Sequence, residues 1–157
     1  MLEQLSTYFN IDVIYLWLNF GVLPFWIILI FFPDSKICSF FVTSIFPYII
    51  FSSIYVYLIY NFYLSEFNFL NNFNLYLGIE ELMILFTDKS FILFFWIHFL
   101  AINLFCGSWI VKDGQINQVS KKIIFLPLLV TYFIGPLGVF IYWFIKIIYA
   151  KKISLFN

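Results

Sequence analysis

The sequence predicts an all-α membrane protein with four transmembrane helices. Hydrophobic residues make up 64% of the 157-residue chain, whereas Asp, Glu, Lys and Arg make up 10%, against about 25% in a typical soluble domain. The mean hydropathy is +1.03. A soluble fold cannot cover its surface with so few charged groups. Four separate stretches are long enough to cross a bilayer core, which takes about 20 apolar residues.

The charge balance and the cysteines exclude two classes of function. Basic and acidic residues number eight each, so the clustered positive field that a nucleic-acid-binding protein needs is missing. Cys38 and Cys106 stand alone, without the spacing or the accompanying His residues of a metal or redox motif. We therefore expect no nucleic-acid partner and no metal site, and the length indicates a single domain over residues 1–157.

The first two predicted spans cover residues 13–32 and 37–60. The first ends at Pro33-Asp34, where a polar turn interrupts the apolar run, and the second contains Pro47. Both are expected to be helices, because a helix satisfies its own backbone hydrogen bonds in lipid.

The other two predicted spans cover residues 91–111 and 123–149. The third follows a cluster of N-capping residues at 87–90, TDKS, and the fourth contains Gly135-Pro136 near its middle. Four spans place both chain ends on the same side of the membrane.

A short amphipathic helix is predicted between the second and third spans. Apolar residues recur at helical spacing between Leu75 and Phe86, with Glu80 and Glu81 on the other face. This pattern is typical of a helix that lies at the membrane surface.

Polar residues of the spans are predicted to lie in a band at similar depth. Counting about 1.5 Å per residue, Asn19, Ser52 and His98 lie about 9–12 Å from the side that holds both chain ends, and Gly135-Pro136 lies one to two turns deeper. Proline lacks an N–H group, so Pro136 frees the carbonyl of Tyr132. Because polar groups at membrane depth usually face a bundle interior or a cavity, we expect His98 to face inward, within reach of Asn19 or this carbonyl.

A purely structural interpretation of the same residues stays open. Serine in a membrane helix often bonds a carbonyl one turn back, and Asn19 and Asn103 could link helices. The small residues on both faces of span 91–111 indicate that this helix lies at the centre of the bundle.

Three runs of residues resemble the neoxanthin-synthase-like membrane family of the abscisic-acid-deficient type. They are WIHFLAINLFCGSW at 96–109, followed by Asp113; GPLGVFIY at 135–142; and WIILIFFP at 26–33. The segment 75–86, which ends in Leu-Phe, is similar as well. Two positions depart from the family: Asn103 replaces an Asp, which removes a charge and a possible proton acceptor, and Ser108 replaces an Arg.

The resemblance implies an enzyme that modifies carotenoids in a plastid, thylakoid or bacterial inner membrane. Neoxanthin forms from violaxanthin by an internal rearrangement, in which an epoxide opens and a neighbouring proton leaves. The reaction needs an acid and a base but no cofactor. Histidine suits both roles near neutral pH, so His98 is the candidate catalytic residue. The candidate substrate- or pigment-binding residues are Asn19, Ser52, Trp96, Asn103, Trp109, Tyr132, Gly135, Pro136 and Tyr142.

A second function fits the same features. The chain could be a non-catalytic subunit of a larger photosynthetic membrane complex that holds carotenoid, chlorophyll or lipid, with His98 as a chlorophyll ligand. In both cases the expected partners are membrane lipids and a carotenoid-like hydrophobic ligand.

Overall fold

The computed structural model describes residues 10–64, 76–151, 153 and 154. Every element in these residues is helical, which confirms the all-α prediction. The chain divides into two compact units. The first comprises Met1–Phe20 and Ile49–Phe99, and the second comprises Gly21–Tyr48 and Leu100–Asn157.

Three of the four predicted spans are present as long apolar helices. They are α2 (Ile11–Phe31), the segment Cys38–Asn61 that includes most of α3 (Phe46–Leu64), and α5 (Lys89–Ile116). Each is long and apolar enough to cross a membrane. Many of their large apolar side chains are exposed, such as Phe20 at 69%, as expected for helices that face lipid. These three helices support the prediction that the chain is a membrane protein.

The second span is broken near its start. A single π-helical turn, η1 (Cys38–Val42), precedes α3, and the three residues Thr43–Ile45 between them are not helical. Ser44 Oγ accepts a hydrogen bond of 3.1 Å from the Phe46 amide, so a side chain replaces a backbone acceptor at the start of α3. Pro47 lies in the first turn of α3, where its missing N–H costs no helical hydrogen bond.

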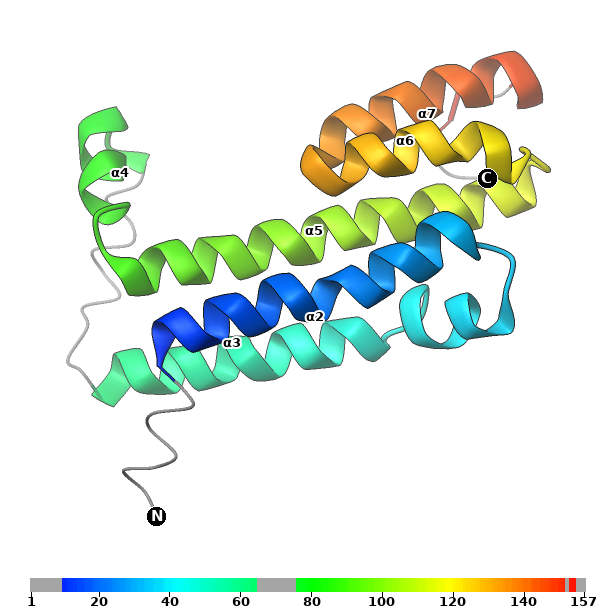
Figure 1. Ribbon diagram of the computed structural model, residues 1–157. Helices are drawn as coiled ribbons and strands as arrows, with labels where there is room; N and C mark the ends of the chain where they lie inside the picture. The colour runs from blue at the N-terminus through cyan, green and yellow to red at the C-terminus, as the bar shows by residue number, and fades with distance from the viewer. Residues whose placement is uncertain (1–9, 65–75, 152, 155–157) are drawn as a thin grey trace. The chain divides into compact units, whose positions relative to one another are not determined.

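The fourth predicted span folds as two helices, so the expectation of one helix over 123–149 is wrong. α6 (Lys121–Phe133) and α7 (Gly135–Ala150) meet at Ile134, which has an extended backbone with φ −142° and ψ 88°. They lie side by side in opposite directions (Figure 1). At 13 and 16 residues they are about 20 and 24 Å long, which is short of the roughly 30 Å hydrocarbon core.

The short surface helix is present as α4 (Ile79–Leu85). None of its residues is buried, and Glu80 and Glu81 lie in its first turn, where acidic groups interact favourably with the helix dipole. The helix lies inside the predicted range of 75–86, whose first residue, Leu75, falls outside the described residues.

Each unit has its own apolar core. In the first unit, Leu58, Leu93 and Ile97 are almost fully buried. In the second, Gly107 lets α5 approach α2 closely: a Cβ atom there would lie 2.8 Å from Leu29 Cδ2 and 2.9 Å from the Trp26 ring. This close contact supports α5 as a central helix of the second unit.

Candidate functional site

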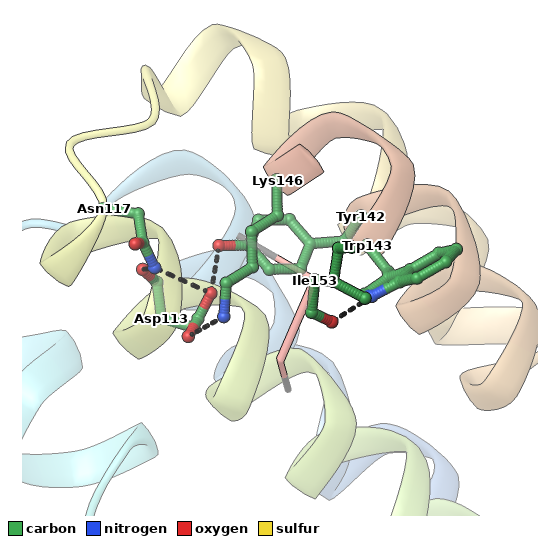
Figure 2. A network of polar contacts seen from close by, with 6 residues as sticks. All are labelled: Asp113, Asn117, Tyr142, Trp143, Lys146 and Ile153. Atoms are coloured by element: carbon green, nitrogen blue, oxygen red, sulfur yellow. Dashed lines mark hydrogen bonds and ion pairs between the residues drawn. The ribbon is translucent and has the colours of Figure 1, made fainter. Parts of the chain in front are cut away.

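A buried ion pair joins α5 to α7 in the second unit. Lys146 Nζ lies 2.8 Å from Asp113 Oδ1, and the Tyr142 hydroxyl donates to Asp113 Oδ2 at 2.7 Å (Figure 2). Asn117 Nδ2 donates to the same Oδ2 at 3.0 Å. Tyr142 and Lys146 are fully buried and Asp113 is 5% exposed. Ion pair and hydrogen bonds together offset the cost of burying the carboxylate.

The local sequence explains how these groups converge. Tyr142 and Lys146 are four residues apart on α7, and Asp113 and Asn117 are four residues apart on α5, so each pair shares a helix face. Asn117 is additionally held by a 2.9 Å bond from its side-chain amide to the Asp113 carbonyl. The result is a compact group of one carboxylate, one ammonium, one phenol and one amide, which we call the Asp113 cluster.

Trp109 forms one wall of the Asp113 cluster. Its ring contacts Tyr142 edge-on, with centroids 5.5 Å apart and an interplanar angle of 87°. Lys146 Nζ lies 5.9 Å from the Trp109 ring centroid, within the range of a cation–π interaction. Trp109 lies one helical turn before Asp113 on α5. Its contacts with Tyr142 and Lys146 therefore add a second attachment between α5 and α7.

Asn103 holds the turn between α6 and α7. Its side-chain amide donates to the Tyr132 carbonyl at 3.3 Å and accepts from the Gly135 amide at 3.2 Å. Asn103 is 2% exposed. The Tyr132 carbonyl, which was predicted to lose its helical hydrogen bond because of Pro136, therefore accepts a hydrogen bond from the Asn103 side chain instead.

The two attachment points fix the direction of α7. Asn103 contacts Gly135, and Asp113 contacts Lys146, so α7 runs parallel to this part of α5. Ten residues on α5 and eleven on α7 correspond to about 15 and 16 Å. Because the two spacings are nearly equal, both contacts fit a parallel pairing of the two helix segments.

Trp109 also lines an open groove. Its volume is about 440 Å³, within the usual range for ligand pockets. The residues that line it come from the break in the second span, from the first turn of α3 and from α5: Thr43, Ser44, Ile45, Tyr48, Phe105, Ser108, Trp109 and Lys112. Since Trp109 contacts both, the groove and the Asp113 cluster share this side chain.

Several polar groups line the groove. Ser108 Oγ donates to the Val42 carbonyl at 3.3 Å, and so satisfies backbone next to the break. Lys112 is exposed and lies 3.5 Å from Ser39 Oγ. Tyr48 contributes a buried hydroxyl to the lining. The groove thus combines aromatic walls with serine, threonine and tyrosine hydroxyls.

Two of the predicted residues meet in the first unit. Trp96 Nε1 donates to Asn19 Oδ1 at 3.2 Å, and Asn19 Nδ2 donates to the Tyr15 carbonyl at 2.7 Å. Tyr15 also packs on Trp96, with ring centroids 6.1 Å apart. This contact agrees with the structural interpretation left open by the sequence, in which Asn19 links helices, and the predicted role of Asn19 in ligand binding stays a prediction.

His98 does not have the environment that was expected. It is exposed on α5, and its ring has no hydrogen-bond partner among the described residues, so the expectation that it faces inward toward Asn19 is wrong. Ser52 is also exposed. Trp96 rather than His98 bonds Asn19, because these two α5 residues point about 160° apart around the helix.

Sequence reasoning did not identify Asp113 and Lys146 as a site. Asp113 entered the prediction only as part of the family pattern. A lysine in an otherwise apolar helix signals a buried partner or a functional group. Its position one helical turn after Tyr142 was the available clue.

The family comparison agrees with the predicted resemblance. The family model described as ABA DEFICIENT 4-like matches residues 13–142, a range that includes the groove residues, the break at Ile134 and Tyr142. The chain matched none of the curated proteins and none of the solved structures with which it was compared. Since the match covers most of its length, the chain belongs to the ABA DEFICIENT 4-like family.

Proposed function

We propose that the chain modifies a xanthophyll within the membrane, as a neoxanthin-synthase-like isomerase. The family match over residues 13–142 carries this proposal. The groove beside Trp109 supports it, because aromatic walls and hydroxyl groups suit a flat apolar molecule with oxygen substituents.

The proposed reaction is an internal rearrangement of an epoxide. A C–O bond of the epoxide breaks and its oxygen takes up a proton, while a neighbouring carbon loses a proton and cumulated double bonds form. Atoms and electrons balance within the substrate. The protein therefore has to supply a proton donor, a proton acceptor and a fixed orientation.

His98 is the proposed proton-transfer residue. Its imidazole is exposed on an apolar helix, so a substrate dissolved in the surrounding bilayer could reach it without opening the protein. Neutral imidazole has one donor and one acceptor nitrogen, which is what the rearrangement requires.

The test is a pigment profile of a violaxanthin-producing host. Wild-type chain should yield neoxanthin, while His98→Gln and His98→Leu should abolish product without lowering the amount of membrane protein. Ser53→Ala is the matched control, since Ser53 is also exposed and its hydroxyl donates to the Ile49 carbonyl of its own helix. An unchanged pigment profile with well-accumulated wild-type protein would contradict the isomerase proposal.

The exposed imidazole also favours a second candidate function, a pigment-binding subunit. An imidazole without a protein partner is a suitable axial ligand for the magnesium of chlorophyll. In this case the chain should comigrate with a photosynthetic complex on native gels, and His98→Leu should reduce bound chlorophyll. A free monomer without chlorophyll would rule out this alternative.

A further inference from the structure

We propose that one end of the second unit binds the anionic phospholipid headgroups of one membrane leaflet. This end, which we call the cationic face, is defined by five exposed lysines: Lys36, Lys112, Lys121, Lys122 and Lys151. Binding at this face is independent of the proposed isomerase reaction, because it involves the lipids around the chain rather than a pigment.

The charges of the chain are divided unevenly between the two units. The net charge of the whole chain is zero. The second unit contains seven lysines and two aspartates, which give it a net charge of +5. The first unit contains one lysine and six acidic residues, which give it a net charge of −5. The overall balance therefore conceals a strongly cationic unit.

Contacts within the second unit bring its exposed lysines to one end. Gln115, in the last turn of α5, donates to the Pro33 carbonyl at 3.0 Å and so holds the turn that contains Lys36 beside this helix end. α6 begins at Lys121, after a linker of four residues. The Asp113 cluster holds the last turn of α7 at the same end, and Figure 1 shows these helix ends together.

Little negative charge offsets the cationic face. The two acidic residues of the second unit are Asp34 and Asp113. Asp113 is buried and paired with Lys146, whereas Asp34 is exposed and accepts a 3.5 Å hydrogen bond from Gln115. Among the residues that the structure describes, no acidic oxygen lies within 4.0 Å of the five lysines of the face. Their ammonium groups are therefore available to an anionic partner.

The surroundings of the lysines favour lipid headgroups over a soluble partner. Large apolar side chains that are more than half exposed lie beside these lysines or one helical turn away: Ile37, Ile116 and Ile148. A lysine in such a position lays its methylene groups along the apolar surface and keeps its ammonium in the polar layer. Groups of about 4–8 basic residues next to membrane helices attract anionic lipids. The cationic face therefore fits a layer of phosphate groups.

The experiment measures the relative affinity of the full chain for two lipids in reconstituted vesicles. The probes are brominated phosphatidylglycerol, which is anionic, and brominated phosphatidylcholine, which is zwitterionic; either lipid quenches tryptophan fluorescence when it lies against the chain. Wild type should prefer phosphatidylglycerol. The double variant Lys121→Gln, Lys122→Gln should lower this preference by about 5-fold or more, since a lysine near a membrane surface contributes about 1 kcal/mol.

Lys89→Gln is the matched control. Lys89 is also an exposed lysine at one end of α5, but it belongs to the first unit and lies 3.7 Å from Asp12 Oδ1. This variant should keep the lipid preference of the wild type. The double variant Lys121→Arg, Lys122→Arg should keep it as well, because the charge is retained. Raising NaCl from 50 to about 500 mM should reduce the preference of the wild type by screening.

Four results would overturn the inference. They are equal affinity of the wild type for both lipids, equal effects of the Lys121→Gln, Lys122→Gln variant and Lys89→Gln, a loss of preference in inorganic phosphate that chloride of equal ionic strength does not cause, and binding of single-stranded RNA in pure phosphatidylcholine vesicles that the Gln variant loses. The third result would identify a site for free phosphate, and the fourth a nucleic-acid surface. Lipid preference without conversion of violaxanthin would contradict the proposed function alone.

Discussion

Asn103 provides both a donor and an acceptor at the turn between α6 and α7. An ionised carboxylate at this position could accept from the Gly135 amide but would repel the Tyr132 carbonyl, whereas a protonated carboxyl group could make both bonds. Asn103 is thus used here for hydrogen bonding to the backbone.

Asn103→Asp should make the stability of the hairpin depend on pH. The folded state favours the protonated acid, so the stability of this variant should fall as the pH rises above the ordinary titration range of Asp. Asn103→Ala should be destabilised at every pH by about 1–3 kcal/mol, because two buried backbone groups lose their partner. Thermal unfolding in detergent between pH 4 and 8 measures both effects; parallel curves for wild type and Asn103→Asp would contradict the assigned hydrogen bonds.

The Asp113–Lys146 pair should show strong coupling. Removing one partner leaves a buried charge and should cost about 3–5 kcal/mol, whereas replacing both by apolar residues should cost much less. A double-mutant cycle of Asp113→Leu and Lys146→Met, followed by thermal unfolding, measures this coupling. If the two single losses simply add, the pair is not the buried contact described above.

At the scale of the elements, the α6–α7 hairpin depends on the close approach of its helices at Gly138. A Cβ atom on Gly138 would lie 2.6 Å from the Pro127 carbonyl oxygen, so Gly138→Ala should force the helices apart and cost about 1–3 kcal/mol. Gly21 is the control, because nothing lies within 4 Å of a Cβ atom there. Gly21→Ala should be neutral or stabilising by about 1 kcal/mol. Equal unfolding temperatures for the two variants would contradict this packing.

The sequence predicts the long helices better than their interruptions. Length and hydropathy are sufficient for α2 and α5, because a membrane span needs only about 20 apolar residues. The Gly135-Pro136 sequence is compatible with either a kinked helix or a complete turn between two helices. The backbone groups of the turn find their hydrogen-bond partner in Asn103, 32 residues earlier in the chain, which the local sequence does not reveal. Lys146 is a similar case. From the sequence alone, a lysine near the end of an apolar helix is expected to extend its charge toward the membrane surface. Only the structure shows that its partner is Asp113, 33 residues earlier in the chain.

At the scale of the whole molecule, the hairpin changes the expected membrane topology. Because α7 runs parallel to the last part of α5, Ala150 lies at the same end of the second unit as Ile116. Three spans followed by a hairpin that enters and leaves on one side should place the two chain ends on opposite sides. Four spans would place them on the same side.

Cysteine accessibility distinguishes these topologies. Asn10→Cys and Ser154→Cys, each made in a Cys38→Ala, Cys106→Ala background, should react with an impermeant thiol reagent from opposite sides of a sealed membrane. Labelling of both positions from the same side would support a fourth crossing.

The account as a whole is tested most directly by supplying violaxanthin to the purified chain in nanodiscs and following the pigments by chromatography. The account predicts that neoxanthin accumulates with time without any added cofactor, and that His98→Gln binds violaxanthin but forms no product. Violaxanthin that stays unchanged in the presence of folded wild-type protein, or equal product formation by His98→Gln, would contradict it.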